Sequence, residues 1–119
     1  EQANKVDKIA GIRLTDVDHE VATILLDLTR RDTKNSSALV AERLVSDARI
    51  KGHRLLRRPH RQAGFAVLKS PSIPSVLVEL GFLSNSKDVI FLKNKKDRLR
   101  IINTIADTID DYFKSKDKL

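Results

Sequence analysis

The stretch Pro71–Asn85, with the sequence PSIPSVLVELGFLSN, holds two of the chain's three prolines, an apolar run, one acidic residue and a Gly-Phe turn. Its run Val76-Leu77-Val78 is continuous and apolar, a pattern typical of strands that are covered on both faces of an α/β sheet. Glu79 ends this run, where a carboxylate is costly to bury unless the site needs one. The pattern therefore predicts a strand over Ser75–Glu79 and makes Glu79 the one carboxylate that we expect to be catalytic. We also expect the apolar side chains Phe65, Leu80 and Phe82 to bury it partly.

The segments on either side of this stretch predict one more strand and two helices. The short apolar run Ala63–Leu68, bounded by Gly and Lys-Ser-Pro, predicts a second strand, joined to the first by a Pro-rich turn over residues 69–74. Asn85 and Asp88 form a capping pair for a short helix that runs through Leu92. A closing amphipathic helix over residues 97–113 is predicted by helical spacing of Leu99, Ile102, Ile105, Ala106, Ile109, Tyr112 and Phe113.

The sequence pattern of the N-terminal half predicts helices. Residues 1–11 predict the end of a helix stopped by Gly11, and an apolar stripe from Val17 to Leu28 predicts the next helix. Asp32–Ser37 reads as a second cap region, which would separate that helix from another over residues 36–51. The order of elements predicts an α/β fold whose two strands are too few for a complete sheet. We therefore expect the missing strands to lie upstream of the chain.

Composition limits the chemistry. The chain has 119 residues, 40% of them hydrophobic and 33% charged, which suits one globular domain or part of one. It has no cysteine, which excludes disulfides, thiolate nucleophiles and Cys-based zinc sites. No apolar run approaches the roughly 20 residues of a membrane span. Because the chain also lacks Met, we expect it to begin inside a longer gene product.

The net charge of +7 is concentrated in one window. Between Ala48 and Val78 there is no acidic residue, and the bases are Arg49, Lys51, Arg54, Arg57, Arg58, Arg61 and Lys69. Three interpretations stay open, in decreasing order of expectation: a solvated face, attraction to an anionic polymer or surface, and nucleic-acid binding. The window lacks the interleaved aromatic residues on which bases stack, so we expect no nucleic-acid partner.

The segment Gln62–Asp88 resembles the C-terminal signature of the zinc-dependent N-acetylmuramoyl-L-alanine amidases of the type-3 fold, which are bacterial cell-wall hydrolases. The similar residues are Val67-Leu68 and the run from Pro74-Ser75 through Glu79 and Gly81-Phe82 to Ser84-Asn85. The ending Ile105, Ala106, Ile109, Tyr112, Phe113 also resembles the family's closing helix. The first half more narrowly resembles the cell-division amidases of Gram-negative bacteria, in which an inserted helical segment covers the active site until activator proteins displace it.

This resemblance implies a function and a division of the chain. It implies a periplasmic enzyme that cleaves the amide between N-acetylmuramic acid and L-alanine of peptidoglycan, with zinc as cofactor and Glu79 as general base. It divides the chain into an inserted regulatory segment, residues 1–35, where an activator protein would bind, and a C-terminal catalytic part, residues 36–119. The family's two His and one Glu zinc ligands precede the insertion, so we expect them upstream of Glu1 and expect the isolated chain to be inactive.

Some residues depart from the family pattern or match no motif. The blocking helix of the subgroup offers zinc a glutamate just before an Asn, but here Ala3 precedes Asn4, and Glu1 lies further upstream. The spacing of His19, His53 and His60 matches no close-spaced metal motif, although His60 lies near enough to the signature to touch substrate. Two alternatives to the enzyme remain: a non-catalytic partner- or wall-binding remnant, and a small basic nucleic-acid-binding protein.

Overall fold

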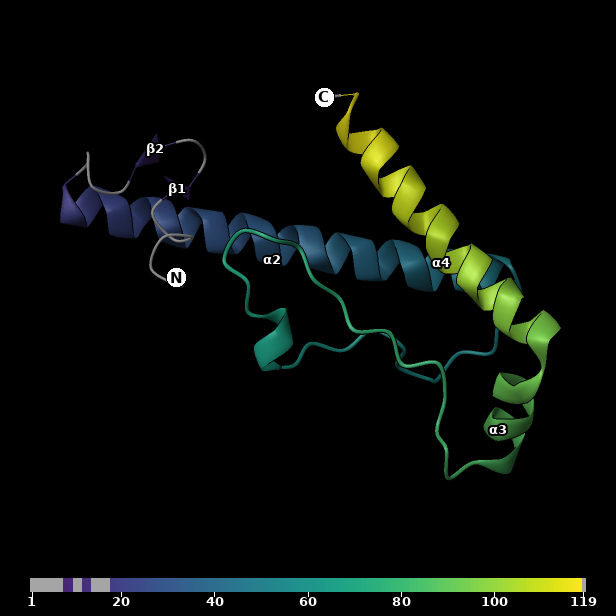
Figure 1. Ribbon diagram of the computed structural model, residues 1–119. Coiled ribbons are helices and arrows are strands. Elements are labelled where there is room, and N and C mark those ends of the chain that lie inside the picture. Colours follow the sequence, from purple (N-terminus) through teal and green to yellow (C-terminus); the bar gives the residue numbers. More distant parts are fainter. Residues whose placement is uncertain (1–7, 10–11, 14–17, 119) are drawn as a thin grey trace. The chain divides into compact units, whose positions relative to one another are not determined.

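The computed structural model describes residues 8–9, 12–13 and 18–118, in which most regular structure is helical (Figure 1). In chain order the elements are β1 (Lys8–Ile9), β2 (Ile12–Arg13), α2 (His19–Ile50), the short 3-10 helix η2 (Ala66–Leu68), α3 (Ser86–Lys93) and α4 (Lys95–Lys116). They belong to two compact units. One unit holds the described residues up to Ser37 together with Gly64–Ser75, and the other holds Ala38–Ala63 with the described residues from Val76 onward.

The predicted α/β sheet is absent from the described residues, and this prediction is wrong. Residues 63–68 contain a turn of 3-10 helix, and residues 75–79 are irregular. The only strands described are β1 and β2, two residues each, paired antiparallel with Ile9 opposite Ile12. A strand needs neighbours to satisfy its backbone N–H and C=O groups and to cover its faces. The described residues supply none for the run at 76–78, whose three side chains are exposed.

The predicted helix end over residues 1–11 lies largely outside the described residues. Where the structure describes this segment, Lys8 and Ile9 form β1, so a helical conformation for these two residues is wrong. A short helix end is marginal without tertiary packing. The backbone pairing with β2 satisfies hydrogen bonds locally instead.

Helix α2 is continuous where the sequence predicted two helices, so the cap region at Asp32–Ser37 is wrong (Figure 1). The polar residues there do not end the helix, and two of their hydroxyls bond to a segment distant in the sequence. Thr33 Oγ1 donates to the carbonyl of Pro71 at 2.9 Å, and Ser37 Oγ accepts from the backbone N–H of Ser75 at 2.9 Å. The side chains that suggested a break are therefore the contacts that hold the Pro-rich segment on α2 within the first unit.

The two C-terminal helices are confirmed. Asn85 caps α3 and Asn94 caps α4, each accepting two backbone N–H groups with its side chain. Helix α4 begins at Lys95 and continues to Lys116, slightly beyond the predicted bounds at both ends. The helix starts earlier than predicted because Asn94 serves as its cap.

The face that α4 buries includes Tyr112 of the predicted stripe but otherwise differs from the predicted one. Its buried side chains are Thr104, Thr108 and Tyr112, one helical turn apart. The predicted apolar stripe is largely exposed at Leu99, Ile102, Ala106, Ile109 and Phe113. The helical period is thus confirmed, but in this chain the polar threonine face packs in the second unit. None of the helices among the described residues is long and apolar enough to cross a membrane.

Candidate active site

Glu79 lies in the irregular segment that leads to α3, and its side chain is exposed. Leu80 and Phe82, which were expected to bury it, are exposed as well, as is Phe65. The expectation that partial burial surrounds Glu79 is therefore wrong for this chain. An exposed carboxylate is accessible to water and to a polymeric substrate, and its catalytic role stays a prediction.

The residues just after Glu79 are anchored to α3. The backbone N–H of Phe82 donates to Asp88 Oδ2 at 3.0 Å, and the N–H of Asn85 donates to the Phe82 carbonyl at 3.0 Å. A Cβ added at Gly81 would lie 3.1 Å from the Cβ of Asp88, closer than a side chain normally approaches. Gly81 therefore allows the backbone to pass directly over the start of α3, and Glu79 precedes this fixed point by two residues.

The start of α3 explains two further residues of the signature. Asn85 Oδ1 accepts from the N–H groups of Lys87 and Asp88 at 3.0 and 3.1 Å, which satisfies two of the free donors at the helix N-terminus. Asp88 in turn places its negative charge in the first turn, where the helix dipole favours it. Gly81, Asn85 and Asp88 thus have structural roles that position the segment carrying Glu79.

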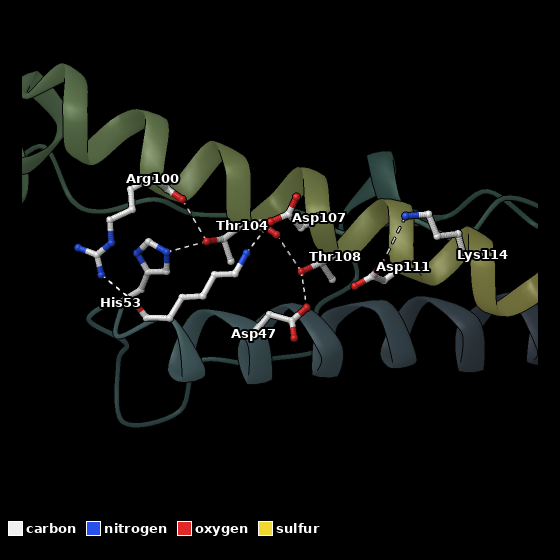
Figure 2. Close-up of polar contacts among 9 residues, drawn as sticks. Asp47, His53, Arg100, Thr104, Asp107, Thr108, Asp111 and Lys114 are labelled. Atoms are coloured by element: carbon white, nitrogen blue, oxygen red, sulfur yellow. Dashed lines mark hydrogen bonds and ion pairs between the residues drawn. The ribbon is translucent and has the colours of Figure 1, made fainter.

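A second group of polar residues joins the end of α2 to α4 (Figure 2). Thr108 Oγ1 donates to Asp47 Oδ2 at 2.6 Å, and its alternative acceptor, the carbonyl of Thr104, lies at 2.9 Å. Nearby, Lys51 Nζ donates to Asp107 Oδ2 at 2.6 Å across the same pair of helices. We call the connected set of Asp47, Lys51, His53, Arg100, Thr104, Asp107 and Thr108 the α2–α4 polar cluster.

His53 enters this cluster through the turn that ends α2. Gly52 has a φ of 74°, its N–H donates to the Arg49 carbonyl at 3.1 Å, and the N–H of His53 donates to the Ala48 carbonyl at 2.8 Å. This is the Schellman pattern, in which a residue in the left-handed region closes the helix. The turn brings His53 Nε2 within 2.8 Å of Thr104 Oγ1.

The surroundings of His53 disfavour its protonation. Burial lowers the pKa of its imidazole, and the positive charges of Arg100 and Lys51 lower the pKa further. Arg100 is held close because its NH2 donates to the carbonyl of Lys51 at 2.8 Å. His53 is therefore a neutral hydrogen-bonding side chain at neutral pH.

The α2–α4 polar cluster is structural. The side chains of Thr104 and Thr108 are each 1% exposed, so no substrate can reach their hydroxyls. Every buried side-chain N or O atom among the described residues has a hydrogen-bond partner, which is the arrangement that stabilises a polar interface. Sequence reasoning missed this cluster because it followed apolar residues. The signal that could have found it is the i, i+4 pair of threonines on α4, opposite Asp47 in the last turns of α2 and Lys51 just after the helix.

The part of the chain that the structure describes supplies no zinc site. No three His, Cys, Asp or Glu side chains lie close enough together there to hold a metal ion. His53 bonds to Thr104, His19 begins α2 with an exposed side chain, and His60 is half-buried in the loop after α2. The residues described here therefore do not fit the family's metal. The expectation that zinc ligands lie upstream of Glu1 stays a prediction, and Glu1 itself lies outside the described residues.

Comparison with known proteins places the chain in a family. Residues 11–111 match the family described as N-acetylmuramoyl-L-alanine amidase, which covers most of the chain. The chain therefore belongs to the N-acetylmuramoyl-L-alanine amidase family, and the resemblance inferred from the signature around Glu79 is confirmed at the level of the family.

The individual relatives are longer proteins. The chain is 43% identical over 114 residues to the amidase AmiA of Salmonella typhimurium and 39% identical over 114 residues to AmiA of Escherichia coli. Each match covers 95% of this chain and 39% of the relative. The amidase AmiC of Neisseria meningitidis is 32% identical over 110 residues, which are 92% of this chain and 26% of the relative. The chain thus spans well under half the length of these relatives.

Proposed function

We propose that this chain is the C-terminal part of a peptidoglycan amidase that cleaves the bond between N-acetylmuramic acid and L-alanine, with Glu79 as general base. Two observations support the proposal. The family match includes the whole signature from Pro74 to Asn85, and Glu79 is the only acidic residue of that signature. The observation that carries most weight is the anchoring of the next residues, Gly81 and Phe82, on α3, because a catalytic carboxylate must be held in place.

The role of Glu79 follows from what amide hydrolysis requires. The carboxylate accepts a proton from the attacking water as its oxygen forms a bond to the carbonyl carbon, and it then donates that proton to the leaving nitrogen. The C–N bond breaks, and the products are the lactyl carboxylic acid of the sugar and the free amine of the alanine. This exchange needs a carboxylate that is accessible to both water and substrate, as the exposed side chain of Glu79 is.

The cofactor proposed for the whole enzyme is zinc. When bound, zinc polarises the scissile carbonyl and makes water more acidic. Because the described residues do not fit a zinc site, the ligands are proposed to belong to sequence that this chain does not include. The chain by itself is then expected to release no peptide from purified muropeptides, and chelator-sensitive release by the isolated chain would contradict this assignment.

A regulatory role for residues 1–35 is part of the same proposal. Val21, Ile24 and Leu28 recur at helical spacing in the first half of α2, and all three are exposed. An apolar helical face of this kind suits an activator protein that docks a helix or groove against it. The proposed location of the enzyme is the periplasm, where peptidoglycan and such activators are accessible. The proposed boundary between residues 35 and 36 falls inside the continuous helix α2.

A chimera tests the catalytic proposal. In the AmiA protein of Salmonella typhimurium, the 114 aligned residues would be replaced by the matching residues of this chain, and peptide release from muropeptides would be measured. The chimera should be active and should lose activity with a chelator. The Glu79→Gln variant should retain its fold and lose a factor of about 10² to 10⁴ in kcat, the usual contribution of general acid–base catalysis.

A matched control separates chemistry from folding. Glu42→Gln removes an exposed carboxylate from α2 and should leave activity unchanged. If the Glu79→Gln chimera were as active as its parent, the general-base assignment would be wrong. A chimera that melts cooperatively but has no activity would contradict the amidase proposal itself.

A further inference from the structure

The segment from the last turn of α2 into the following loop carries several closely spaced arginines. Its arginines are exposed, and no acidic side chain among the described residues forms an ion pair with any of them. We call this the Arg49–Arg61 surface; it consists of Arg49, Arg54, Arg57, Arg58 and Arg61 together with two apolar residues, Ile50 and Leu56. Charges that have no ion-pair partner in the described part of the chain are available to an external anion.

The same surface exposes large apolar side chains between its arginines. Ile50 is 80% exposed at the end of α2, and Leu56 is 53% exposed between Arg54 and Arg57. Keeping such side chains in water is unfavourable. A partner that offers both negative charge and an apolar layer would satisfy both features at once.

The second unit extends this positive surface onto α4. Arg100 bonds to the last turn of α2 through the Lys51 carbonyl, and it lines an open depression with Lys95, Lys96, Leu99 and Asn103. Leu99 is exposed at this depression, so the pattern of cations beside an exposed apolar side chain recurs there. The Schellman turn at Gly52 fixes how the loop leaves α2 and therefore keeps its first residues beside Arg100.

We infer that the Arg49–Arg61 surface binds the surface of an anionic phospholipid bilayer, with the arginines on the lipid phosphates and Ile50 and Leu56 in the interfacial layer. Guanidinium groups bind phosphate oxygens in pairs, and apolar side chains flanked by bases are typical of interfacial binding. Nucleic acid is disfavoured because no Phe, Tyr or Trp lies between residues 49 and 61 to stack on bases. A carboxylate-bearing polymer such as peptidoglycan would leave the two apolar side chains in water.

The test is sedimentation of the 119-residue chain with vesicles. Binding is expected to vesicles of phosphatidylcholine mixed with phosphatidylglycerol, to weaken with salt, and to be absent for phosphatidylcholine alone. Each base near an anionic surface strengthens partition about fivefold, so Arg57→Gln with Arg58→Gln should weaken binding about 25-fold. Leu56→Ser should also weaken it, because it removes the apolar contact but no charge.

Matched variants identify the surface. Arg31→Gln with Lys34→Gln removes two exposed charges from α2 outside the surface, and Ile90→Ser removes an exposed apolar side chain from α3. Both should bind nearly as the parent does. Equal binding to both kinds of vesicle, or equal losses in surface and control variants, would overturn the inference. So would binding to DNA or to cell-wall sacculi with none to the anionic vesicles. The amidase assignment does not enter this test, and the two proposals can fail separately.

Discussion

The substitution Thr108→Val tests whether the α2–α4 polar cluster holds the two helices together. It keeps the shape of the side chain and its β-branch, and it removes only the hydroxyl. That hydroxyl is 1% exposed and donates to the Asp47 carboxylate at 2.6 Å. Valine therefore leaves Asp47 without this donor and creates no cavity.

The expected loss follows from the type of hydrogen bond. Bonds to a charged group contribute about 1.5–3 kcal/mol to stability. Asp47 is only half-buried, so water can partly replace the lost donor. This places the expected destabilisation near the lower limit, at about 1.5 kcal/mol.

Tyr112 provides a local assay. It is the only tyrosine in a chain without tryptophan, it is buried, and it lies one turn beyond Thr108 on α4. Its fluorescence during urea unfolding therefore reports the packing of α4 in the second unit. The Thr108→Val transition should shift to lower urea with little change in slope.

The matched control is Thr23→Val, which removes an exposed hydroxyl that donates to the His19 carbonyl within α2. It should change stability by less than about 0.5 kcal/mol. In an Asp47→Ala background, Thr108→Val should also become nearly neutral, because its partner is gone. The interpretation would be refuted if the loss were the same with and without Asp47, or no larger than in the control.

Three further predictions concern the turns and caps. The pKa of His53 is lower in the folded chain than its ordinary value of 6.5, so the protein takes up a proton when it unfolds at acid pH. The stability that neutral His53 contributes is therefore fully present above pH 6.5 and is lost as the pH falls through the lowered pKa. Urea midpoints from neutral to acid pH should show this loss in the parent and a smaller one in His53→Gln. Gly52→Ala should lower the free energy of unfolding by about 1–2 kcal/mol in the same assay, because alanine is strained at a positive φ. The added Cβ itself would lie at an ordinary 3.7 Å from Arg100, and a neutral effect would contradict the left-handed turn. Asn85→Ala should lose about 1 kcal/mol of capping and speed amide hydrogen exchange at Lys87 and Asp88, while unchanged exchange would refute the cap.

The helices predicted from capping residues and helical spacing are confirmed, because the groups that interact there lie close together in the sequence. Asn85 and Asp88 predicted the start of α3, and the structure shows Asn85 accepting from two backbone N–H groups. The period of residues 97–113 predicted α4. Caps and helical hydrogen bonds join residues at most a few positions apart, so the local sequence specifies where a helix begins and ends.

The non-local expectations failed together, for one reason. A strand over Ser75–Glu79 and the burial of Glu79 both require neighbouring strands and covering helices. The described residues contain none for this segment, and the apolar run beside Glu79 is exposed. A continuous apolar run indicates that a segment can be buried on both faces. It forms a strand only where neighbouring strands are present to pair with it.

The sequence by itself determined the family, through the signature that ends at Asn85. It also determined the positions of α3 and α4, through the capping residues and the helical spacing of apolar residues. Only the tertiary structure decided that α2 runs unbroken through Thr33 and Ser37. It also decided that α4 buries Thr104 and Thr108 in place of most of its apolar stripe. The physical reason is that a hydroxyl has two possible roles. It can cap a helix by accepting from the free backbone N–H groups at the helix start, or it can bond to a segment distant in sequence. The choice between them depends on which partner the fold brings within hydrogen-bonding distance.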